Sequence, residues 1–215
     1  MSYLDSAAHV RVLMVCMGNI CRSPTAHGVL EKMVREAGLH DRITVDSAGT
    51  HDHHVGAPPD QRSQQHAAQR GYDLSGQRAR HLTARDLADF DLVLVMDGVN
   101  ERAVRALCRP GQGHKLHRLT DFCARHQAAE VPDPYYGGAM GFETVLDLVE
   151  EACAALLERL RARAPRQHRP SRAMRLRRAG AGSDGLQTSA LARQSGKTVC
   201  QEIEQLPHGR THPPP

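Results

Sequence analysis

The chain has 215 residues, a length that allows one ordinary domain with some excess. Aromatic residues make up only 3% of it and Trp is absent, so a core has to be built from aliphatic side chains and methionine. The formal net charge is +4, but residues 166–215 alone carry +6 and the rest −2, so the basic balance does not mark the main domain as a nucleic-acid binder. No apolar stretch approaches the ~20 residues of a membrane helix, and the first nine residues do not have the pattern of a secretory signal.

Apolar runs and helical spacing alternate along the chain. Strands are expected over residues 11–15, 43–47, 92–96 and 115–119. Helices are expected between Ser23 and Gly38, over 60–70, from Thr83, over 100–109 and over 142–160. In the first of these helices Ser23 is the expected N-cap, and Pro24 occupies the first turn, where its missing N–H costs least. The alternation predicts an α/β fold, a three-layer sandwich in which helices cover both faces of a four-stranded, parallel, twisted sheet.

The composition changes near Pro165, where the apolar periodicity stops. The residues that follow are rich in Arg, Gly, Ser, Gln and Pro and contain no aromatic side chain. Such a segment buries too little apolar surface to offset its ordering entropy, so we expect it to be disordered. The sequence therefore predicts a short lead over residues 1–9, one domain over 10–164 and a basic tail over 165–215.

The stretch from Cys16 to Pro24 reads Cys-Met-Gly-Asn-Ile-Cys-Arg-Ser-Pro and lies between the first strand and the first helix. A loop in this place can direct successive backbone N–H groups onto one point and bind an anion. The planar guanidinium of Arg22 matches two phosphate oxygens. Cys16 would lie in an electropositive environment, which favours the thiolate and makes it a nucleophile. The residues predict a site for attack on phosphorus.

This string resembles the phosphate-binding loop of the low-molecular-weight protein tyrosine phosphatases. The resemblance covers about residues 10–163, and further motifs follow in the family's order over 46–50, 56–60, 92–97, 133–137 and 142–145. It implies a phosphate-binding loop directly after the first strand. It also implies a protein tyrosine phosphatase that hydrolyses phosphotyrosine through a phosphocysteine intermediate, with no cofactor and no metal.

The resemblance assigns roles to particular residues. Cys16 is the expected nucleophile, Arg22 the phosphate-binding cation, and Asp133, between two prolines, the general acid and base. The expected phosphate-binding residues are Met17, Gly18, Asn19, Ile20, Cys21, Arg22 and Ser23. Asn19 is expected to order the loop with support from Ser47. Gln77 is expected to join that support, because it lies in the segment after Leu74-Ser75, where family members often carry a histidine bonded to the asparagine, and glutamine can also donate and accept.

Two tyrosines and one histidine are expected to shape the substrate slot. Tyr135 and Tyr136 follow the acid directly. When the chain is aligned with the family at Gly56, His53 falls on the opposing wall of the slot. His51 and His54 accompany His53 in one loop, where solvent-facing histidines are more common than zinc ligands.

Six cysteines occur without any C-x-x-C pair, as in reduced cytosolic proteins, so we expect a cytoplasmic protein. The resemblance further implies that Cys21 forms a disulfide with Cys16 and so protects the nucleophile from over-oxidation.

Other activities on the same scaffold stay open at this point. A protein arginine phosphatase has a similar loop with Thr in place of Ile20, whose apolar bulk favours a phenyl ester. An arsenate reductase needs further cysteines, for which Cys108 and Cys123 are available but fifteen positions apart. A phosphotyrosine-binding module without catalysis would need neither the nucleophile nor the acid. The expected partner is a phosphotyrosine-containing protein, with a tyrosine kinase as one candidate, and the expected state is a monomer.

Overall fold

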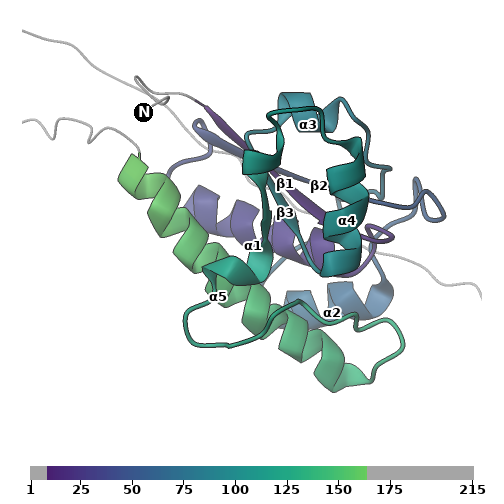
Figure 1. Ribbon diagram of the computed structural model, residues 1–215. Coiled ribbons are helices and arrows are strands. Elements are labelled where there is room, and N and C mark those ends of the chain that lie inside the picture. The colour runs from purple at the N-terminus through teal and green to yellow at the C-terminus, as the bar shows by residue number, and fades with distance from the viewer. Residues whose placement is uncertain (1–8, 164–215) are drawn as a thin grey trace, which may run out of the picture. The chain divides into compact units, whose positions relative to one another are not determined.

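Four parallel strands form one sheet in the order β2-β1-β3-β4. The computed structural model describes residues 9–163 of the chain (Figure 1). The strands are β1 (Val10–Cys16), β2 (Ile43–Gly49), β3 (Leu92–Val95) and β4 (Leu116–Arg118). Strand β1 lies between two neighbours and is buried from Val12 to its end, as its continuous apolar run predicts.

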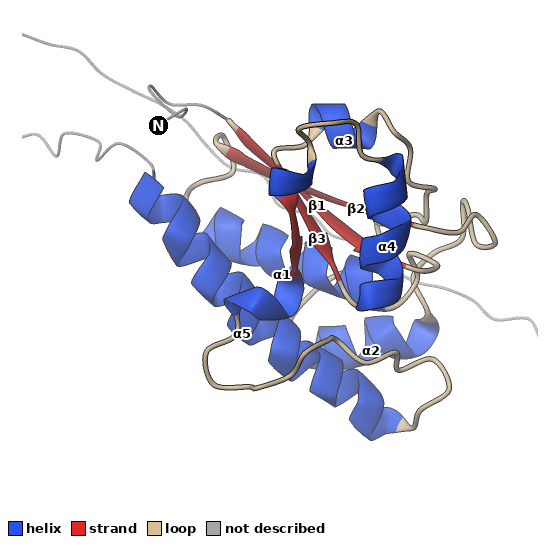
Figure 2. Ribbon diagram, viewed as in Figure 1, coloured by secondary structure: helices blue, strands red, loops and turns tan. Residues whose placement is uncertain are grey.

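Helices cover both faces of this sheet (Figures 1 and 2). The helices are α1 (Arg22–Glu36), α2 (Gln61–Gln69), α3 (Asp86–Asp89), α4 (Gly98–Leu107) and α5 (Ala139–Arg163). One apolar cluster joins α1 and α5 to alternate residues of the strands, and α2 packs beside them. A second cluster joins α3 and α4 to the other face. The three-layer α/β sandwich with a four-stranded parallel sheet is therefore confirmed.

The first helix begins at Arg22, two residues before the start that a Ser23 cap implies. Its N-cap is Cys21, which makes no capping hydrogen bond with its side chain, so the prediction that Ser23 caps this helix is wrong. Ser23 is fully buried inside the first turn, and its hydroxyl is directed at Cys16 and Asn19 instead. The Ser23 hydroxyl therefore belongs to the hydrogen bonds of the loop and does not cap the helix. The helix ends before Gly38, whose φ of 67° is the left-handed conformation expected of a glycine stop.

The pairing of β1 with β2 fixes where the following loop begins. Cys16, the last residue of β1, is opposite Gly49, the last residue of β2. A Cβ atom at Gly49 would lie 2.8 Å from the Met17 carbonyl oxygen and 3.1 Å from the Asn19 nitrogen, so only glycine allows this approach. Beyond it, the backbone N–H of Thr50 donates to the Cys16 carbonyl at 2.9 Å. Strand β2 and its continuation therefore support the loop from one side.

No helix among residues 9–163 combines the length and the apolar character needed to cross a bilayer. The expected basic tail over 165–215 and all but the last residue of the expected 1–9 lead lie outside the described residues.

Helix α5 holds the segment that leads into the predicted acid loop. The carboxylate of Glu151, only 8% exposed, accepts backbone N–H groups of Ala124 at 2.7 Å and Arg125 at 2.5 Å. It also contacts the ring and the backbone N–H of His126. The pKa of Glu151 falls from 4.5 to about 2. The largest cause is the hydrogen bond from the Arg125 backbone N–H, and the next is the contact with the His126 ring.

We expect Glu151 to stabilise the fold in a pH-dependent way. A carboxylate with a lowered pKa in the folded state stabilises it above the ordinary pKa, and that stabilisation is lost as the pH falls from 4.5 toward 2. Glu151→Gln should therefore lower the melting temperature near neutral pH, and the difference from wild type should shrink at acid pH. Glu158→Gln, an exposed carboxylate of the same helix, is the control and should change little. A difference that does not depend on pH would contradict this role.

Candidate active site

A cleft of about 210 Å³ opens at the carboxyl ends of β1 and β2. Loops far apart in the sequence contribute to it, and its lining residues are Cys16, Met17, Gly18, Ile20, Cys21, Arg22, His51, His53, His54, Asp133, Tyr135 and Tyr136. All the residues predicted as catalytic and all those predicted as substrate walls are among them. The carboxyl end of a parallel sheet is where ligands of α/β proteins usually bind.

The sulfur of Cys16 lies at the base of this cleft with two hydrogen-bonding neighbours. The backbone N–H of Asn19 donates to Sγ at 3.3 Å, and the hydroxyl of Ser23 lies 3.0 Å from it. Cys16 is 3% exposed. Both contacts stabilise negative charge on sulfur, and both come from the turn that follows β1.

Asn19 is the structural centre of that turn. Its φ of 55° makes it the one non-glycine residue in the left-handed region among residues 9–163. Its Nδ2 donates to the hydroxyls of Ser23 and Ser47, each at 2.9 Å, and its Oδ1 accepts the backbone N–H of Arg80 at 2.9 Å. Asparagine tolerates this conformation better than most residues. Asn19 and Ser47 are thus in the contact that the sequence predicted, whereas the contribution of the Arg80 backbone was missed.

Gln77 does not take the predicted place beside Asn19. Its Nε2 donates to the carbonyl oxygen of Pro24 at 3.0 Å, and its Oε1 is buried without a partner among the described residues. The prediction is wrong because two serine hydroxyls and the Arg80 amide already use both hydrogens and the oxygen of the Asn19 amide. Gln77 therefore supports the first turn of α1 and not the loop.

The guanidinium of Arg22 is buried between two carboxylates. Nη1 donates to Asp97 at 2.5 Å and to the Val131 carbonyl at 3.2 Å, while Nη2 donates to Asp133 at 2.7 Å. Burial alone would lower the pKa of Arg22, but Cys16 and the two carboxylates outweigh it and raise that pKa. Arg22 is therefore a fixed cation at the point where Cys16 and Asp133 meet.

Asp97 was not singled out from the sequence as a site residue. It is the N-cap of α4, where its Oδ1 accepts the N–H of Asn100 at 2.7 Å while Oδ2 binds Arg22. A signal was available, because Asp97 closely follows β3, the strand beside β1. Carboxyl ends of neighbouring parallel strands meet at one edge of the sheet.

The segment that carries Asp133 is held from outside by Arg62, in the first turn of α2. Arg62 donates through Nη1 to the Tyr135 carbonyl at 3.1 Å and pairs with Asp60. Its guanidinium also lies 5.4 Å from the ring centre of Tyr135 and 4.9 Å from that of Phe142. This residue too was missed, since nothing in its local sequence distinguishes it from an exposed helix arginine.

The two tyrosines and the histidine loop stand at the mouth of the cleft. Tyr135 and Tyr136 pack edge to face at 5.0 Å, and Tyr136 is 96% exposed. His51 and His53 stack with ring centres 5.7 Å apart. Among residues 9–163, no group of three or more His, Cys, Asp or Glu side chains is placed to hold a metal ion.

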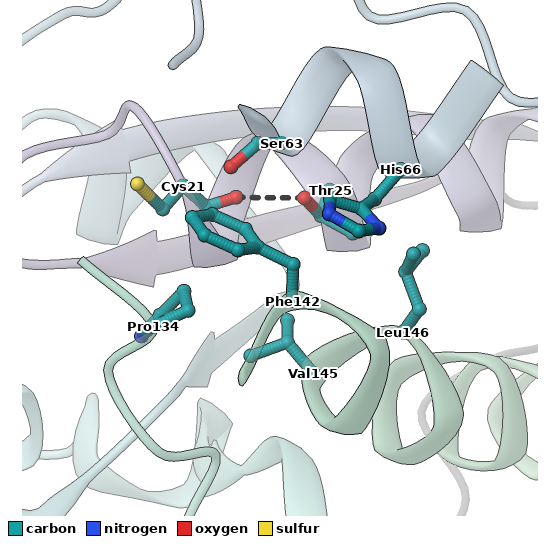
Figure 3. Close-up of a pocket in the computed structure, with 8 residues that line it drawn as sticks. All are labelled: Cys21, Thr25, Ser63, His66, Pro134, Phe142, Val145 and Leu146. Atoms are coloured by element: carbon teal, nitrogen blue, oxygen red, sulfur yellow. Dashed lines mark hydrogen bonds between the residues drawn. The ribbon is translucent and has the colours of Figure 1, made fainter. Parts of the chain in front are cut away.

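Cys21 lines both the cleft and a narrow pocket beside it (Figure 3). Phe142 of α5, Pro134 and Ser63 of α2 surround it, and the Cys21 carbonyl accepts the hydroxyl of Thr25 at 2.8 Å. Burial is the main cause that raises the pKa of Cys21 to about 12, so this sulfur stays a thiol at neutral pH. Cys16 and Cys21 are both free in the structure. Their disulfide stays a prediction.

Fold and cleft together define a class: an α/β protein with a cysteine, an arginine and a carboxylate at the end of its central strand, arranged for phosphoryl chemistry. The sequence profile described as low molecular weight phosphotyrosine protein phosphatase matches residues 11–166. The chain therefore belongs to that family.

Particular relatives resemble the domain over nearly their whole length. A family relative in Synechocystis sp. is 47% identical over 152 residues, which cover 70% of this chain and 96% of the relative. The human low molecular weight phosphotyrosine protein phosphatase is 37% identical over 154 residues, covering 69% of this chain and 94% of its own. A crystal structure of a protein tyrosine phosphatase from Entamoeba histolytica matches with a TM-score of 0.69 at 37% identity, covering 71% of this chain and 97% of that one.

The hydrogen bonds of Asn19 lead to a prediction about stability. Asn19→Ala should lower the free energy of unfolding through lost buried hydrogen bonds, at about 1 kcal/mol each, and through about 1–2 kcal/mol of backbone strain. Asn19→Gly removes the same hydrogen bonds but tolerates the positive φ, so it should be the more stable of the two variants. Denaturant unfolding measures both. An alanine variant as stable as the glycine variant would show that the turn does not keep its left-handed conformation.

Proposed function

We propose that this chain is a protein tyrosine phosphatase that hydrolyses phosphotyrosine through a phosphocysteine intermediate. The observation that carries the proposal is the meeting of three groups in one cleft. Cys16 receives two hydrogen bonds, Arg22 is a fixed cation, and Asp133 is a carboxylate paired with that cation. Nucleophile, phosphate-binding group and acid are the parts that such a reaction needs.

In the first step the thiolate of Cys16 attacks phosphorus. Arg22 and the backbone of the loop bind the phosphate oxygens, which places phosphorus in line with sulfur. A sulfur–phosphorus bond forms as the bond from phosphorus to the phenol oxygen breaks. Asp133, displaced from Arg22 by the incoming phosphate group, takes up a proton from solvent and gives it to that oxygen, so tyrosine leaves as a neutral phenol. The incoming dianion takes over the Nη2 group that Asp133 binds in the free protein.

In the second step water attacks the phosphocysteine. Asp133, now ionised, accepts a proton from the water, and the sulfur–phosphorus bond breaks to release inorganic phosphate. The leaving group is the Cys16 thiolate, which the hydroxyl of Ser23 and the N–H of Asn19 stabilise. Ser23 is suited to this role because Asn19 donates to its oxygen at 2.9 Å, and the sulfur at 3.0 Å is nearer to its hydroxyl than the Ala48 carbonyl oxygen at 3.4 Å.

The mouth of the cleft suits a flat aromatic ring. Tyr135 and Tyr136 form one wall and His53 contributes to the other. The apolar side chain of Ile20 also lines the cleft, which favours a phenyl ester over a charged guanidinium. These contacts support phosphotyrosine as the substrate group.

The two spare cysteines support a phosphatase over an arsenate reductase. Cys108 packs against the apolar cluster beneath α4, whereas Cys123 packs against the cluster beneath α1 and α5. The sheet lies between these clusters, so the two sulfurs are not placed to pass a disulfide between them.

The physiological partner would be a phosphotyrosine-containing protein, for which a tyrosine kinase is one candidate. Reduced cysteines support a cytoplasmic location, since five of the six are free thiols within the described residues. A monomer is the state we propose, because the cleft is completed by residues of a single chain.

Replacement of the nucleophile tests the covalent mechanism. Cys16→Ser keeps the side-chain shape but replaces a thiol by a hydroxyl that no neighbouring base activates. We expect a folded protein with no measurable turnover of p-nitrophenyl phosphate. Cys108→Ser is the control and should keep wild-type turnover. Appreciable activity in Cys16→Ser, with an unchanged melting temperature in both variants, would exclude the phosphocysteine.

Replacement of the acid tests the role of Asp133. Asp133→Ala should slow the hydrolysis of phenyl phosphate by about 10²–10⁴-fold. It should affect p-nitrophenyl phosphate much less, because that phenol leaves without a proton. Asp41→Ala, an exposed aspartate away from the cleft, serves as the control. Equal losses on both substrates would make Asp133 a residue that only orients Arg22.

A further inference from the structure

A continuous chain of polar contacts runs from Cys16 to His27 on helix α1. It passes from Cys16 Sγ to Ser23 Oγ at 3.0 Å, and from there to Asn19 Nδ2 at 2.9 Å. Asn19 Nδ2 reaches Ser47 Oγ at 2.9 Å, and Ser47 Oγ lies 3.4 Å from Nδ1 of His27. The first four residues belong to the loop and its predicted support. His27 has no role in the mechanism above.

The contact with Arg80 sets the direction of the hydrogen bonds that Asn19 makes in this chain. The N–H of Arg80 donates to Asn19 Oδ1, which fixes the orientation of the amide and directs both hydrogens of Nδ2 at the two serines. Each serine oxygen therefore accepts from Asn19 and has one proton of its own to donate. Ser23 can give its proton to the sulfur at 3.0 Å or to the more distant carbonyl oxygen of Ala48 at 3.4 Å. Among residues 9–163, the acceptor for the Ser47 hydroxyl proton is Nδ1 of His27.

His27 fits this acceptor role only as a neutral ring with its proton on Nε2. Its side chain is half-buried on α1, next to β2 and to the segment that contains Arg80. Burial is the main cause that lowers the pKa of His27, and the positive charge of Arg80 acts in the same direction. The carboxylates of Asp46 and Glu31 oppose them without reversing the shift. At neutral pH the ring is thus free to accept.

We propose that His27 is a positioning residue for catalysis, which keeps the phosphate-binding loop aligned by accepting the hydroxyl proton of Ser47. This proposal rests on the proposed phosphatase function. It adds a group on helix α1 that never touches the substrate but acts through Ser47 and Asn19. Asn19 needs such support, because it holds a left-handed backbone conformation directly beside the nucleophile.

Protonation of His27 would reverse the last contact in the chain. Nδ1 would then carry a hydrogen and donate, so Ser47 would face two donors and its own proton would lose its acceptor. A buried hydroxyl without an acceptor is unfavourable, so either Ser47 or the Asn19 amide has to turn. The loop should therefore lose its alignment at the acid pH at which His27 takes up a proton.

Two substitutions at His27 separate alignment from packing. In His27→Asn the side-chain oxygen can replace Nδ1 as an acceptor, but it does not titrate. His27→Leu fills space without any acceptor. The control is His66→Asn on α2, which breaks a contact with Glu143 and has no hydrogen bond to the residues of this chain. Each protein is assayed across pH for kcat and KM with p-nitrophenyl phosphate, and for the rate at which iodoacetamide alkylates Cys16, followed by mass spectrometry of the Cys16 peptide.

We expect His27→Leu to lower kcat/KM near neutral pH by about 2- to 10-fold, mainly through kcat, the effect of one lost hydrogen bond. His27→Asn should recover most of this loss. The ratio of the alkylation rate of wild type to that of His27→Asn should fall as the pH is lowered, since only the wild-type side chain at position 27 can take up a proton. For His66→Asn the corresponding ratio to wild type should not change with pH.

The proposal is overturned if His27→Asn follows wild type at every pH, or if both substitutions at His27 impair the protein equally. Should His27→Leu fail to fold, the pH comparison of wild type with His27→Asn decides alone. A wild-type protein without phosphatase turnover would refute the proposed function instead. The alkylation profile would still report whether His27 controls Cys16.

Discussion

The left-handed turn at Asn19 is the constraint on which the active site depends. A single amide group joins three separate parts of the chain: the start of α1 through Ser23, strand β2 through Ser47, and the segment after α2 through Arg80. Each contact uses a hydrogen or lone pair that no other group can replace. Because the backbone N–H of the same residue donates to Cys16 Sγ, the position of this sulfur follows from the network. The apolar layers of the sheet bring the three segments close, and the amide fixes their final arrangement.

Charge in the cleft is organised around one buried cation. Arg22 has two carboxylates as partners, and they differ in what they can do. Asp97 is 15% exposed and tied to the first turn of α4, so it stays in place. Asp133 is 44% exposed and lies in a loop, so its bond to Arg22 can be exchanged for one to an anion. A buried arginine without a permanent partner would be costly, and Asp97 removes that cost while Asp133 keeps one side available.

Much of the fold and part of the site could be predicted from the sequence. The strands and long helices have clear periodicities, and the Cys16 to Pro24 string marks the loop. Residues that act through tertiary contacts were harder to find. Asp97 looks like an ordinary helix cap, and His27 is one polar residue in the first helix. Gln77 was assigned by analogy to a contact with Asn19 that the backbone N–H of Arg80 makes instead. A backbone donor leaves no trace in residue identity, so this part of the network needed the coordinates.

Arg62 has a consequence for the timing of the catalytic cycle. The segment from Asp133 to Tyr135 is attached at two points, to Arg22 on the inside and to Arg62 on the outside. When a phosphate group displaces the inner contact, the outer one does not compete with it and keeps the segment where it is. Entry of the substrate therefore changes one ion pair without freeing the loop that carries the proposed acid. The ordering entropy of that loop is then spent once, during folding, and not again in each turnover.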